Sequence, residues 1–416
     1  MAVHVYIKEK FYLKLRGSLQ HACFHKKEDG ILNKRIGIIG GGISGTALGY
    51  NLSLYEDAEI TLFEKDAIGC GTTAKSAGTV CLFDDSLNNR YFDVRLYGFE
   101  TYLKMEAEAP GSAGFDKTGT LVVATSPEVE ERIKTGIALA KSAGYTGEYI
   151  TDTARIEEIL PGINTENILG AGYTEDDGYF DATMISNTFA GKMVSNGAKI
   201  LTGKRVTELI KEGGEAKGLK TSDGKEYEFD VIVDCTGPWS RFTGKMAGLD
   251  VPIWHTKAEA FFLAPPVKRE GYVFPIIKYP AFYALRAGDN IFICKSHLSM
   301  NLDDPMHAGQ WNPDSLPRTG GTDEYFIEFL FDQMDTFIPE LADSCLVSSW
   351  LSYRAETRDF LPIIGETPLK NYLLATGYGG NGVIEAPAVS RDLARYIMRK
   401  ESTLLLEEWA FKRLLK

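Results

Sequence analysis

Three glycines and one glutamate in the N-terminal part of the chain have the spacing of a phosphate-binding turn. Gly40, Gly42 and Gly45 fit the pattern G-x-G-x-x-G, and Glu64 follows 19 residues after the last glycine. In such a turn the first glycine permits a tight bend, the second lets the backbone approach a pyrophosphate, and the third lets a helix pack against a strand. The helix N-terminus adds N–H groups and a partial positive charge. Because a carboxylate at the position of Glu64 can accept both ribose hydroxyls, these residues predict a dinucleotide site.

Such a turn needs a strand before it and a helix after it, and the sequence predicts both. Residues 36–39 form an apolar run typical of a buried strand, residues 43 to about 55 are expected to be helical, and residues 58–64 have the composition of a second strand. Together they make a βαβ unit. The simpler interpretation is a glycine-rich turn with an exposed glutamate nearby and no ligand. It does not explain why the turn follows a strand, opens a helix and has the glutamate at the end of the next strand. The motif itself fits NAD and FAD.

The middle of the chain differs from its two ends. Strands and helices alternate near both ends, whereas residues 251–350 contain aromatic-rich runs without a helix between each pair. This pattern favours a mixed or antiparallel sheet, and hence a mixed α/β (α+β) fold in which a Rossmann-like cofactor domain is interrupted by a substrate domain. The expected boundaries are an N-terminal extension at 1–33, a discontinuous cofactor domain at 34–110, 172–247 and 346–400, a substrate domain at 111–171 and 248–345, and a C-terminal tail at 401–416.

Composition narrows the class of protein. The 416 residues carry a formal net charge of −12, which argues against nucleic acid as a partner. The six cysteines form no C-x-x-C pair, so we expect no metal site and a reducing, cytoplasmic location. No apolar run is long enough to cross a membrane. The first 34 residues carry seven Lys or Arg against three acidic residues, and we interpret them as a poorly ordered extension, with a targeting peptide as the alternative.

Further blocks of sequence decide between the two dinucleotides. They are GCGTTAKSAG at 69–78, DGYFD at 177–181, VDCTGPWS at 233–240 and ATGYGGNG at 375–382, the last leading into a helical run to 395. In this order, and over residues 34 to about 399, they resemble the D-amino-acid oxidase superfamily of flavoproteins, which includes glycine oxidase, sarcosine oxidase and dimethylglycine dehydrogenase. The resemblance implies that the cofactor is FAD.

The resemblance also implies which residues hold the cofactor. Residues 69–78 would form a second flavin-contacting loop, Arg205 and Val206 would contact the adenine through their backbone, and the last block would close the flavin site. A helix N-terminus aimed at the flavin N1–C2=O edge would stabilise the reduced ring. The predicted cofactor-binding residues are Gly40, Gly42, Ile43, Ser44, Gly45, Glu64, Lys65, Thr72, Thr73, Ser76, Ala77, Val206, Thr236, Gly237, Trp239, Gly377, Gly379, Gly380, Asn381 and Gly382.

Two departures from the family bear on how the flavin is held. Dimethylglycine dehydrogenase relatives attach it covalently to a histidine in the second loop, where this chain carries Lys75. Sarcosine oxidase attaches it to a cysteine at the position that corresponds to Ser352. We therefore expect FAD to be bound without a covalent link.

The segment SYRAETRDFLPIIG at 352–365 resembles the family motif R-P-x-T-x-D-x-x-P-x-I-G, with Ala355 in place of the first proline. By this resemblance Arg354 binds the substrate carboxylate, a role that suits the planar guanidinium. The alternative is an interface arginine paired with Glu356 or Asp359. Tyr283 would lie on a strand that faces the substrate side of the flavin, where it could hold the amino acid or close the pocket. A core tyrosine is the alternative.

The resemblance implies an FAD-dependent oxidoreductase that oxidises the C–N bond of a small amino acid or secondary amine, similar to glycine, sarcosine or proline. A hydride would pass to flavin N5, and the resulting imine would hydrolyse. Oxygen, a quinone or a protein carrier would accept the electrons. Two alternatives stay open: a 2-hydroxy-acid or polyol-phosphate dehydrogenase on the same fold, and an electron-relay FAD subunit of a larger dehydrogenase complex.

Overall fold

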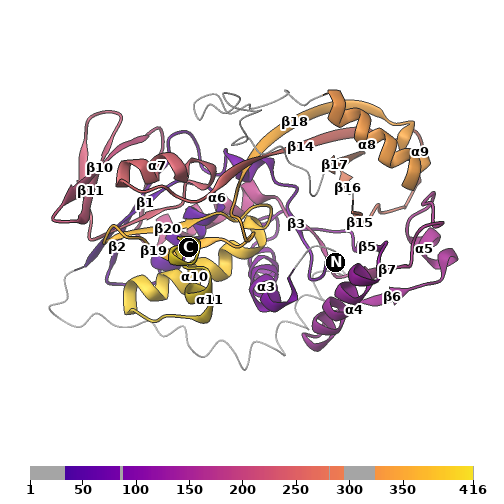
Figure 1. Cartoon of the computed structure of the whole chain (residues 1–416), viewed down its shortest axis with the longest axis horizontal. Coiled ribbons are helices and arrows are strands. Elements are labelled where there is room, and N and C mark those ends of the chain that lie inside the picture. Colours follow the sequence, from indigo (N-terminus) through magenta and orange to yellow (C-terminus); the bar gives the residue numbers. More distant parts are fainter. Residues whose placement is uncertain (1–32, 85–87, 281, 295–323, 416) are drawn as a thin grey trace.

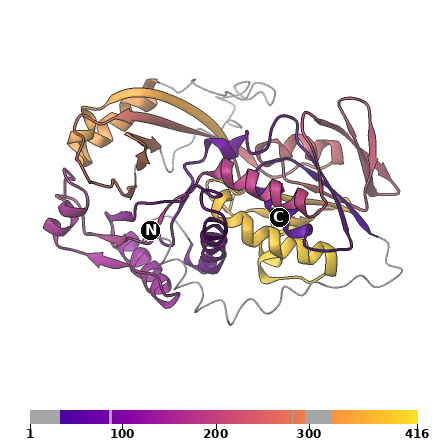
Figure 2. The same ribbon diagram turned by 180° about the vertical axis from the view of Figure 1, so that it is seen from behind.

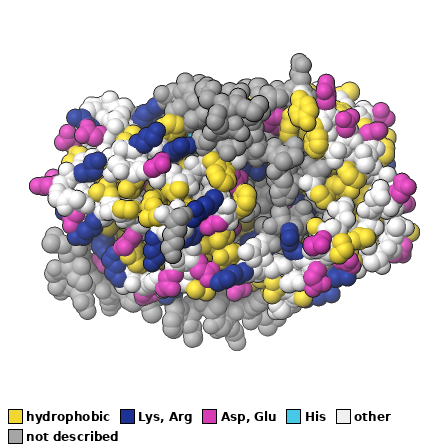
Figure 3. All heavy atoms as spheres, in the orientation of Figure 1, with side chains coloured by type: hydrophobic (Ala, Val, Ile, Leu, Met, Phe, Trp, Pro, Cys, Tyr) yellow, Lys and Arg dark blue, Asp and Glu magenta, His cyan; other side chains and the backbone are white. Residues whose placement is uncertain are grey.

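The computed structural model describes residues 33–84, 88–280, 282–294 and 324–415, so the predicted N-terminal extension lies almost entirely outside the described residues. Two large sheets organise the molecule, and each has its own hydrophobic core (Figure 1). None of the described helices is both long and apolar enough to cross a lipid bilayer. On the face shown in Figure 3, Lys and Arg side chains are interspersed with Asp and Glu side chains.

The first sheet has six strands in the order β19-β20-β13-β1-β2-β9, and all neighbouring pairs are parallel except β19 with β20. Buried residues cover both of its faces, which explains why β1 and β2 are almost continuously apolar. Helix α2 packs between α6 and α10, and α3 packs on α10. The elements are β1 (Lys34–Ile39), α2 (Ile43–Leu52), β2 (Ala58–Phe63), α3 (Phe92–Glu108), α6 (Ala182–Ser195), β9 (Lys199–Leu201), β13 (Val231–Asp234), α7 (Ser240–Ala247), β19 (Ile363–Glu366), β20 (Tyr372–Thr376) and α10 (Gly382–Arg399).

The second sheet has eight strands in the order β18-β14-β17-β16-β15-β5-β7-β6, and only the β15–β5 pair is parallel. The mixed sheet that the sequence predicted for residues 251–350 is therefore confirmed, and so is the fold class. The elements are β5 (Thr120–Ala124), α4 (Pro127–Ser142), β6 (Glu148–Ile150), α5 (Thr153–Ile159), β7 (Gly170–Thr174), β14 (Trp254–Ala264), β15 (Ile276–Lys278), β16 (Tyr283–Ala287), β17 (Asn290–Cys294), α8 (Glu324–Phe337), α9 (Pro339–Ala342) and β18 (Cys345–Glu356).

Two small sheets and a C-terminal segment complete the described chain. One sheet joins β10 (Val206–Glu212), β11 (Glu215–Thr221) and β12 (Glu226–Glu228), and the other joins β3 (Thr79–Val80), β8 (Gly178–Tyr179) and β4 (Asp116–Lys117). The segment after α10 contains α11 (Leu404–Glu408) and packs on the first sheet, where Trp409 is fully buried and its carbonyl accepts a hydrogen bond from Ile364 N.

The long strands β14 and β18 connect the two halves of the molecule. They pair antiparallel from Trp254–Glu356 at one end to Ala264–Cys345 at the other. Figures 1 and 2 show both strands extending from the second sheet toward the first. The end of β18 that carries Arg354 therefore lies next to the first sheet. The two-domain boundaries proposed from the sequence stay a prediction.

Candidate active site

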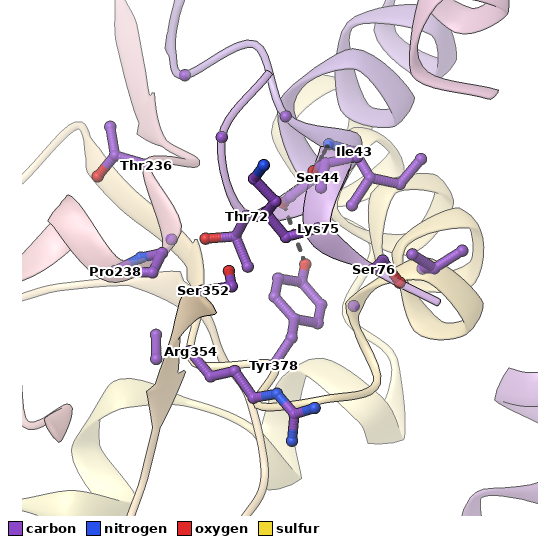
Figure 4. Close-up of a pocket in the computed structure, with 18 of the residues that line it drawn as sticks. Ile43, Ser44, Thr72, Lys75, Ser76, Thr236, Pro238, Ser352, Arg354 and Tyr378 are labelled. Carbon is purple, nitrogen blue, oxygen red and sulfur yellow. Dashed lines mark hydrogen bonds between the residues drawn. The ribbon is translucent and has the colours of Figure 1, made fainter. Parts of the chain in front are cut away.

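A cavity of about 420 Å³ is lined by residues of both sheets, a volume that is ordinary for a small-molecule or cofactor site. Every site residue predicted from the sequence lines this cavity except Gly45. Figure 4 shows residues of α2, of the second loop, of β18 and of the loop before α10 around one space, with the Tyr378 hydroxyl directed at Ser44. The structure thus brings together segments that lie up to about 340 residues apart.

The glycine-rich turn has the shape that a pyrophosphate requires. Gly40 has a positive φ of 105°, and a Cβ on it would lie 2.7 Å from the Cys235 carbonyl oxygen. Helix α2 begins directly after Gly42, which has no side chain to cap it, and its first turn contains no acidic residue. Its N-terminal end therefore presents a partial positive charge at the cavity wall, where Ile43 and Ser44 line the space.

Glu64 is held in place beside this turn. One of its carboxylate oxygens accepts a hydrogen bond from Gly41 N at 2.7 Å and the other from Asp66 N at 2.8 Å. Its side chain still lines the cavity, next to Lys65. This position fits the predicted contact with a ribose. The donors at the helix end and the fixed carboxylate together fit the ADP half of FAD.

The second loop joins the two halves of the cavity. It contains the 3₁₀ helix η1 (Thr72–Lys75), whose Thr73 hydroxyl accepts a hydrogen bond from Ile43 N at 3.1 Å. The Thr72 hydroxyl donates to the Tyr353 carbonyl of β18 at 3.0 Å. This loop therefore positions the start of α2 and the end of β18 relative to one another.

The loop that precedes α10 forms another wall. Ser44 Oγ lies 3.2 Å from Tyr378 Oη, and Gly379 N donates to the Ala355 carbonyl at 2.9 Å. Gly379 has a φ of 53°, and a Cβ on it would lie 2.4 Å from a carboxylate oxygen of Glu356. The loop can follow this path only because residue 379 has no side chain.

The second sheet presents one row of side chains to the cavity. Lys278, Tyr283, Cys294, Ala260 and Trp350 stand opposite one another across β15, β16, β17, β14 and β18, and all five line the cavity. Opposed residues of antiparallel strands point to the same face of the sheet. This face is therefore one wall of the site, and the sheet register determines which residues it presents.

The two predicted substrate residues lie on this wall. Arg354 is partly buried, and its guanidinium lies beside Gly380, where a Cβ would be 3.4 Å from Nη1. The alternative pairing of Arg354 with Asp359 is disfavoured, because Arg413 binds Asp359 at 2.8 Å. Burial raises the pKa of Tyr283 well above its usual value, so its phenol stays protonated. Both residues can therefore offer hydrogen-bond donors to a carboxylate, and their roles stay predictions.

A family model described as "DAO: FAD dependent oxidoreductase" matches residues 35–396, which include the whole of this cavity. The chain belongs to this family. FAD is thus its cofactor, and it is an FAD-dependent oxidoreductase, as the sequence resemblance implied.

Several relatives in the family are similar over most of the chain. Dimethylglycine dehydrogenase of Mus musculus is 26% identical over 88% of this chain and 42% of that protein, so the chain spans less than half the length of this relative. Glycine oxidase of Geobacillus kaustophilus is 23% identical over 91% of this chain and 96% of that protein. The crystal structure of L-proline dehydrogenase from P. horikoshii has a TM-score of 0.78 at 25% identity, and covers 92% of this chain and 98% of that one.

Acid precipitation of the purified flavoprotein should give a colourless pellet and a yellow supernatant, which absorbance at 450 nm of both fractions would measure. Lys75 and Ser352 line the cavity, and by the sequence resemblance they stand at the two positions where a covalent link to the flavin would otherwise be expected. Cys81 also lines it, but burial raises the pKa of this thiol to about 12 and leaves little of the reactive thiolate. A pellet that stays yellow after washing would contradict non-covalent binding.

Two polar residues of β14 are buried near the site. From the sequence, Lys257 is expected to face solvent as a charged strand residue, and this expectation is wrong: its side chain is only 10% exposed, and its Nζ lies 2.5 Å from the carboxylate of Glu259. From the sequence, His255 is expected to have a structural role. It is buried, and its Nε2 lies 2.7 Å from the Pro238 carbonyl oxygen, in keeping with that expectation.

Sequence reasoning missed two groups of buried charges at the site. Lys278 and Asp84 line the cavity as an ion pair, with Nζ 3.0 Å from Oδ2. Glu385, in the first turn of α10, is buried behind the loop that precedes it, near Arg95 of α3. No local pattern marks either group, because each is assembled from segments that are distant in sequence. The sequence does contain one hint of a buried charge, which is a charged residue directly after an apolar run, as at Lys278.

Glu385→Gln should stabilise the protein at alkaline pH. Burial raises the pKa of Glu385 to about 8; the charge of Arg95 lowers it, and that of Glu356 raises it further. In the native protein the Glu385 carboxyl stays neutral up to about pH 8, whereas in the unfolded chain it ionises near pH 4.5. Between these two pH values ionisation favours the unfolded chain. The free energy of unfolding therefore falls as pH rises from about 4.5 through 8. The glutamine variant should unfold like wild type at pH 5. It should exceed wild type by roughly 1–3 kcal/mol at pH 9 in thermal or urea unfolding.

Glu407→Gln provides the control, since Glu407 is exposed on α11. That substitution should change stability by the same small amount at pH 5 and at pH 9. A Glu385→Gln variant that loses more stability at pH 9 than at pH 5 would show that the buried carboxyl is ionised and needed as a charge.

Proposed function

We propose that this FAD-dependent oxidoreductase oxidises the C–N bond of a small amino acid or secondary amine that carries a carboxylate. The observation that supports the proposal is the position of Arg354 and Tyr283 on one wall of a cavity whose other walls fit FAD. Relatives and structural neighbours named glycine oxidase, dimethylglycine dehydrogenase and L-proline dehydrogenase point to the same class of substrate. Each of these names denotes oxidation of an amine that also bears a carboxylate.

Arg354 and Tyr283 would orient the substrate. The guanidinium would take the carboxylate through two parallel hydrogen bonds, and the Tyr283 phenol could donate a third. With the carboxylate bound by these hydrogen bonds, the amine-bearing carbon would face the space between the second sheet and the glycine-rich turn. FAD, when bound, supplies the hydride acceptor. The protein's contribution is orientation of the substrate and exclusion of water from the space between substrate and cofactor.

The substrate amine needs no side-chain base in this scheme. It enters as the neutral amine, and its lone pair assists the departure of the hydride from the adjacent carbon. The carbon–hydrogen bond breaks, a carbon–nitrogen double bond forms, and the two electrons reduce the cofactor. Water then adds to the imine outside the redox step and releases the amine and a carbonyl product.

Anaerobic mixing of the holoenzyme with a panel of compounds tests this function. Glycine, sarcosine, dimethylglycine and proline should bleach the 450 nm flavin band, and at least one should do so within seconds. Lactate and glycerol 3-phosphate test the alternative of a hydroxy-acid or polyol-phosphate dehydrogenase. If no compound bleaches the flavin but dithionite does, the electron-relay subunit becomes the better assignment. Admitting air, and separately a quinone, then identifies the electron acceptor.

A further inference from the structure

We propose that Lys278 binds a second carboxylate of the substrate, so that the cavity is built for amino dicarboxylates. The proposal deepens the proposed function, because it assumes that Arg354 binds the first carboxylate. Lys278 is the last residue of β15 and stands directly opposite Tyr283 of β16. Its Nζ lies 4.7 Å from the centre of the Tyr283 ring. The ammonium is therefore next to the residue that we place beside the first carboxylate.

Lys278 has donor capacity left for a ligand. An ammonium group carries three N–H donors. Among the residues that the structure describes, Lys278 contacts the Asp84 carboxylate at 3.0 Å and the face of the Tyr283 ring. Its side chain is 13% exposed, and Lys278 is one of the residues that line the cavity. At least one N–H can thus reach an oxygen atom of a molecule in the cavity.

Asp84 helps to keep this lysine charged. Burial lowers the pKa of Lys278 most, but the charge and hydrogen bond of Asp84, together with Cys81 and Tyr283, outweigh burial and raise the pKa. Asp84 is itself 7% exposed and reaches the cavity from the segment after β3. A protonated ammonium held in a partly desolvated site forms its strongest hydrogen bonds with an anionic acceptor. A carboxylate is therefore the group that this subsite would select over an apolar or cationic one.

The charges around Tyr283 support an anionic ligand with two ends. Burial raises the pKa of Tyr283, and the positive charges of Arg354 and Lys278 both act to lower it, which places both cations near the phenol. Both cations also line the same cavity. A substrate with a carboxylate at each end can contact both of them at once.

Binding of unreactive probes to the holoenzyme tests the proposal without turnover. Perturbation of the flavin absorption spectrum would give dissociation constants for propionate, butyrate and pentanoate, and for malonate, succinate and glutarate, which have the same chain lengths in that order. We expect at least one dicarboxylate to bind about tenfold or more tightly than the monocarboxylate of the same chain length. Equal constants across all three pairs in the wild-type protein would overturn the proposal.

A variant shows whether Lys278 is responsible. Lys278→Gln should remove the dicarboxylate advantage, so that within this variant the dissociation constants of each monocarboxylate and dicarboxylate pair differ by no more than about threefold. The matched control is Lys268→Gln, because Lys268 also pairs with an aspartate, Asp289, at 3.1 Å, but is 68% exposed and does not line the cavity. A dicarboxylate advantage that survives in Lys278→Gln would also overturn the proposal. If that variant cannot hold FAD, the wild-type comparison still decides.

The same proteins separate this inference from the proposed function. N-(carboxymethyl)glycine should bleach the flavin with a higher kcat/KM than N-methylglycine in wild type, and the ratio should fall about tenfold in Lys278→Gln. If amines reduce the flavin but no dicarboxylate is preferred, only the second-carboxylate site is wrong. If dicarboxylates are preferred in the binding assay but no amine reduces the flavin, only the proposed function is wrong.

Discussion

Arg354→Ala should lower kcat/KM for carboxylate-bearing amines by about 100- to 1,000-fold. Loss of one partner of a buried, hydrogen-bonded charge pair costs roughly 2–5 kcal/mol, and each 1.4 kcal/mol is a factor of ten. Arg354 is partly buried against Gly380 at the end of β18, where solvent can replace it only in part. Most of the loss should appear as a higher KM. Stopped-flow reduction of the flavin at varied substrate concentration would measure both parameters.

Two controls decide whether the effect comes from the carboxylate contact. Arg358→Ala removes an exposed arginine four residues further along, whose Nη2 donates to the Arg413 carbonyl at 3.2 Å, and it should leave kcat/KM within about twofold of wild type. An amine without a carboxylate should lose little activity in Arg354→Ala. Equal losses for substrates with and without a carboxylate would mean that Arg354 has a structural role only.

Local patterns predicted the glycine-rich unit closely. The structure begins α2 at Ile43, as expected, and ends β2 at Phe63, one residue before the expected end. Helix α4 begins at Pro127, and the Ser126 side chain accepts a hydrogen bond from Val129 N, a start that the residue types Ser and Pro favour. In each case the determinants lie within a few residues of the element, so the sequence contains the information directly.

Contacts between distant segments could not be predicted in this way. Asp84 and Lys278 are separated by almost 200 residues and meet only in the folded chain, where the segment after β3 reaches the end of β15. No local signal reveals that the Lys257 side chain is only 10% exposed and paired with Glu259. Glu385 is polar and lies on a helix, so sequence alone favours an exposed position. Its burial follows from the packing of α3 on α10, where Gly98 lies against the Ile384 carbonyl oxygen.

The resemblance to a family contributed what the local patterns could not. It grouped Thr72, Trp239 and Gly379 at one site, although they lie on different segments, and the structure places all three around one cavity. It gave no indication of Lys278, because that residue lies outside the blocks that carry the resemblance. Site residues outside those blocks therefore had to come from the structure.

Gly45→Ala should prevent stable FAD binding. A Cβ on Gly45 would lie 1.9 Å from the Gly40 carbonyl oxygen and 3.4 Å from Cys235 Cβ. The first of these is a backbone atom, so no change of rotamer can relieve the overlap, and α2 must move away from β1. That movement displaces the N–H groups at the helix end from the position that the pyrophosphate needs. We expect a loss of stability of at least about 3 kcal/mol and protein that purifies without yellow colour.

The matched control for this substitution is Gly191→Ala in α6. Gly191 is also a helix-interior glycine, but a Cβ on it would meet no atom within 4 Å. Alanine has the higher helix propensity, so this variant should keep its FAD and gain up to about 1 kcal/mol. Flavin content per chain and the thermal unfolding midpoint would measure both variants. Gly45→Ala protein that keeps one FAD per chain would show that the turn tolerates a side chain at this position, and that the helix end does not need to be this close to β1 to hold the cofactor.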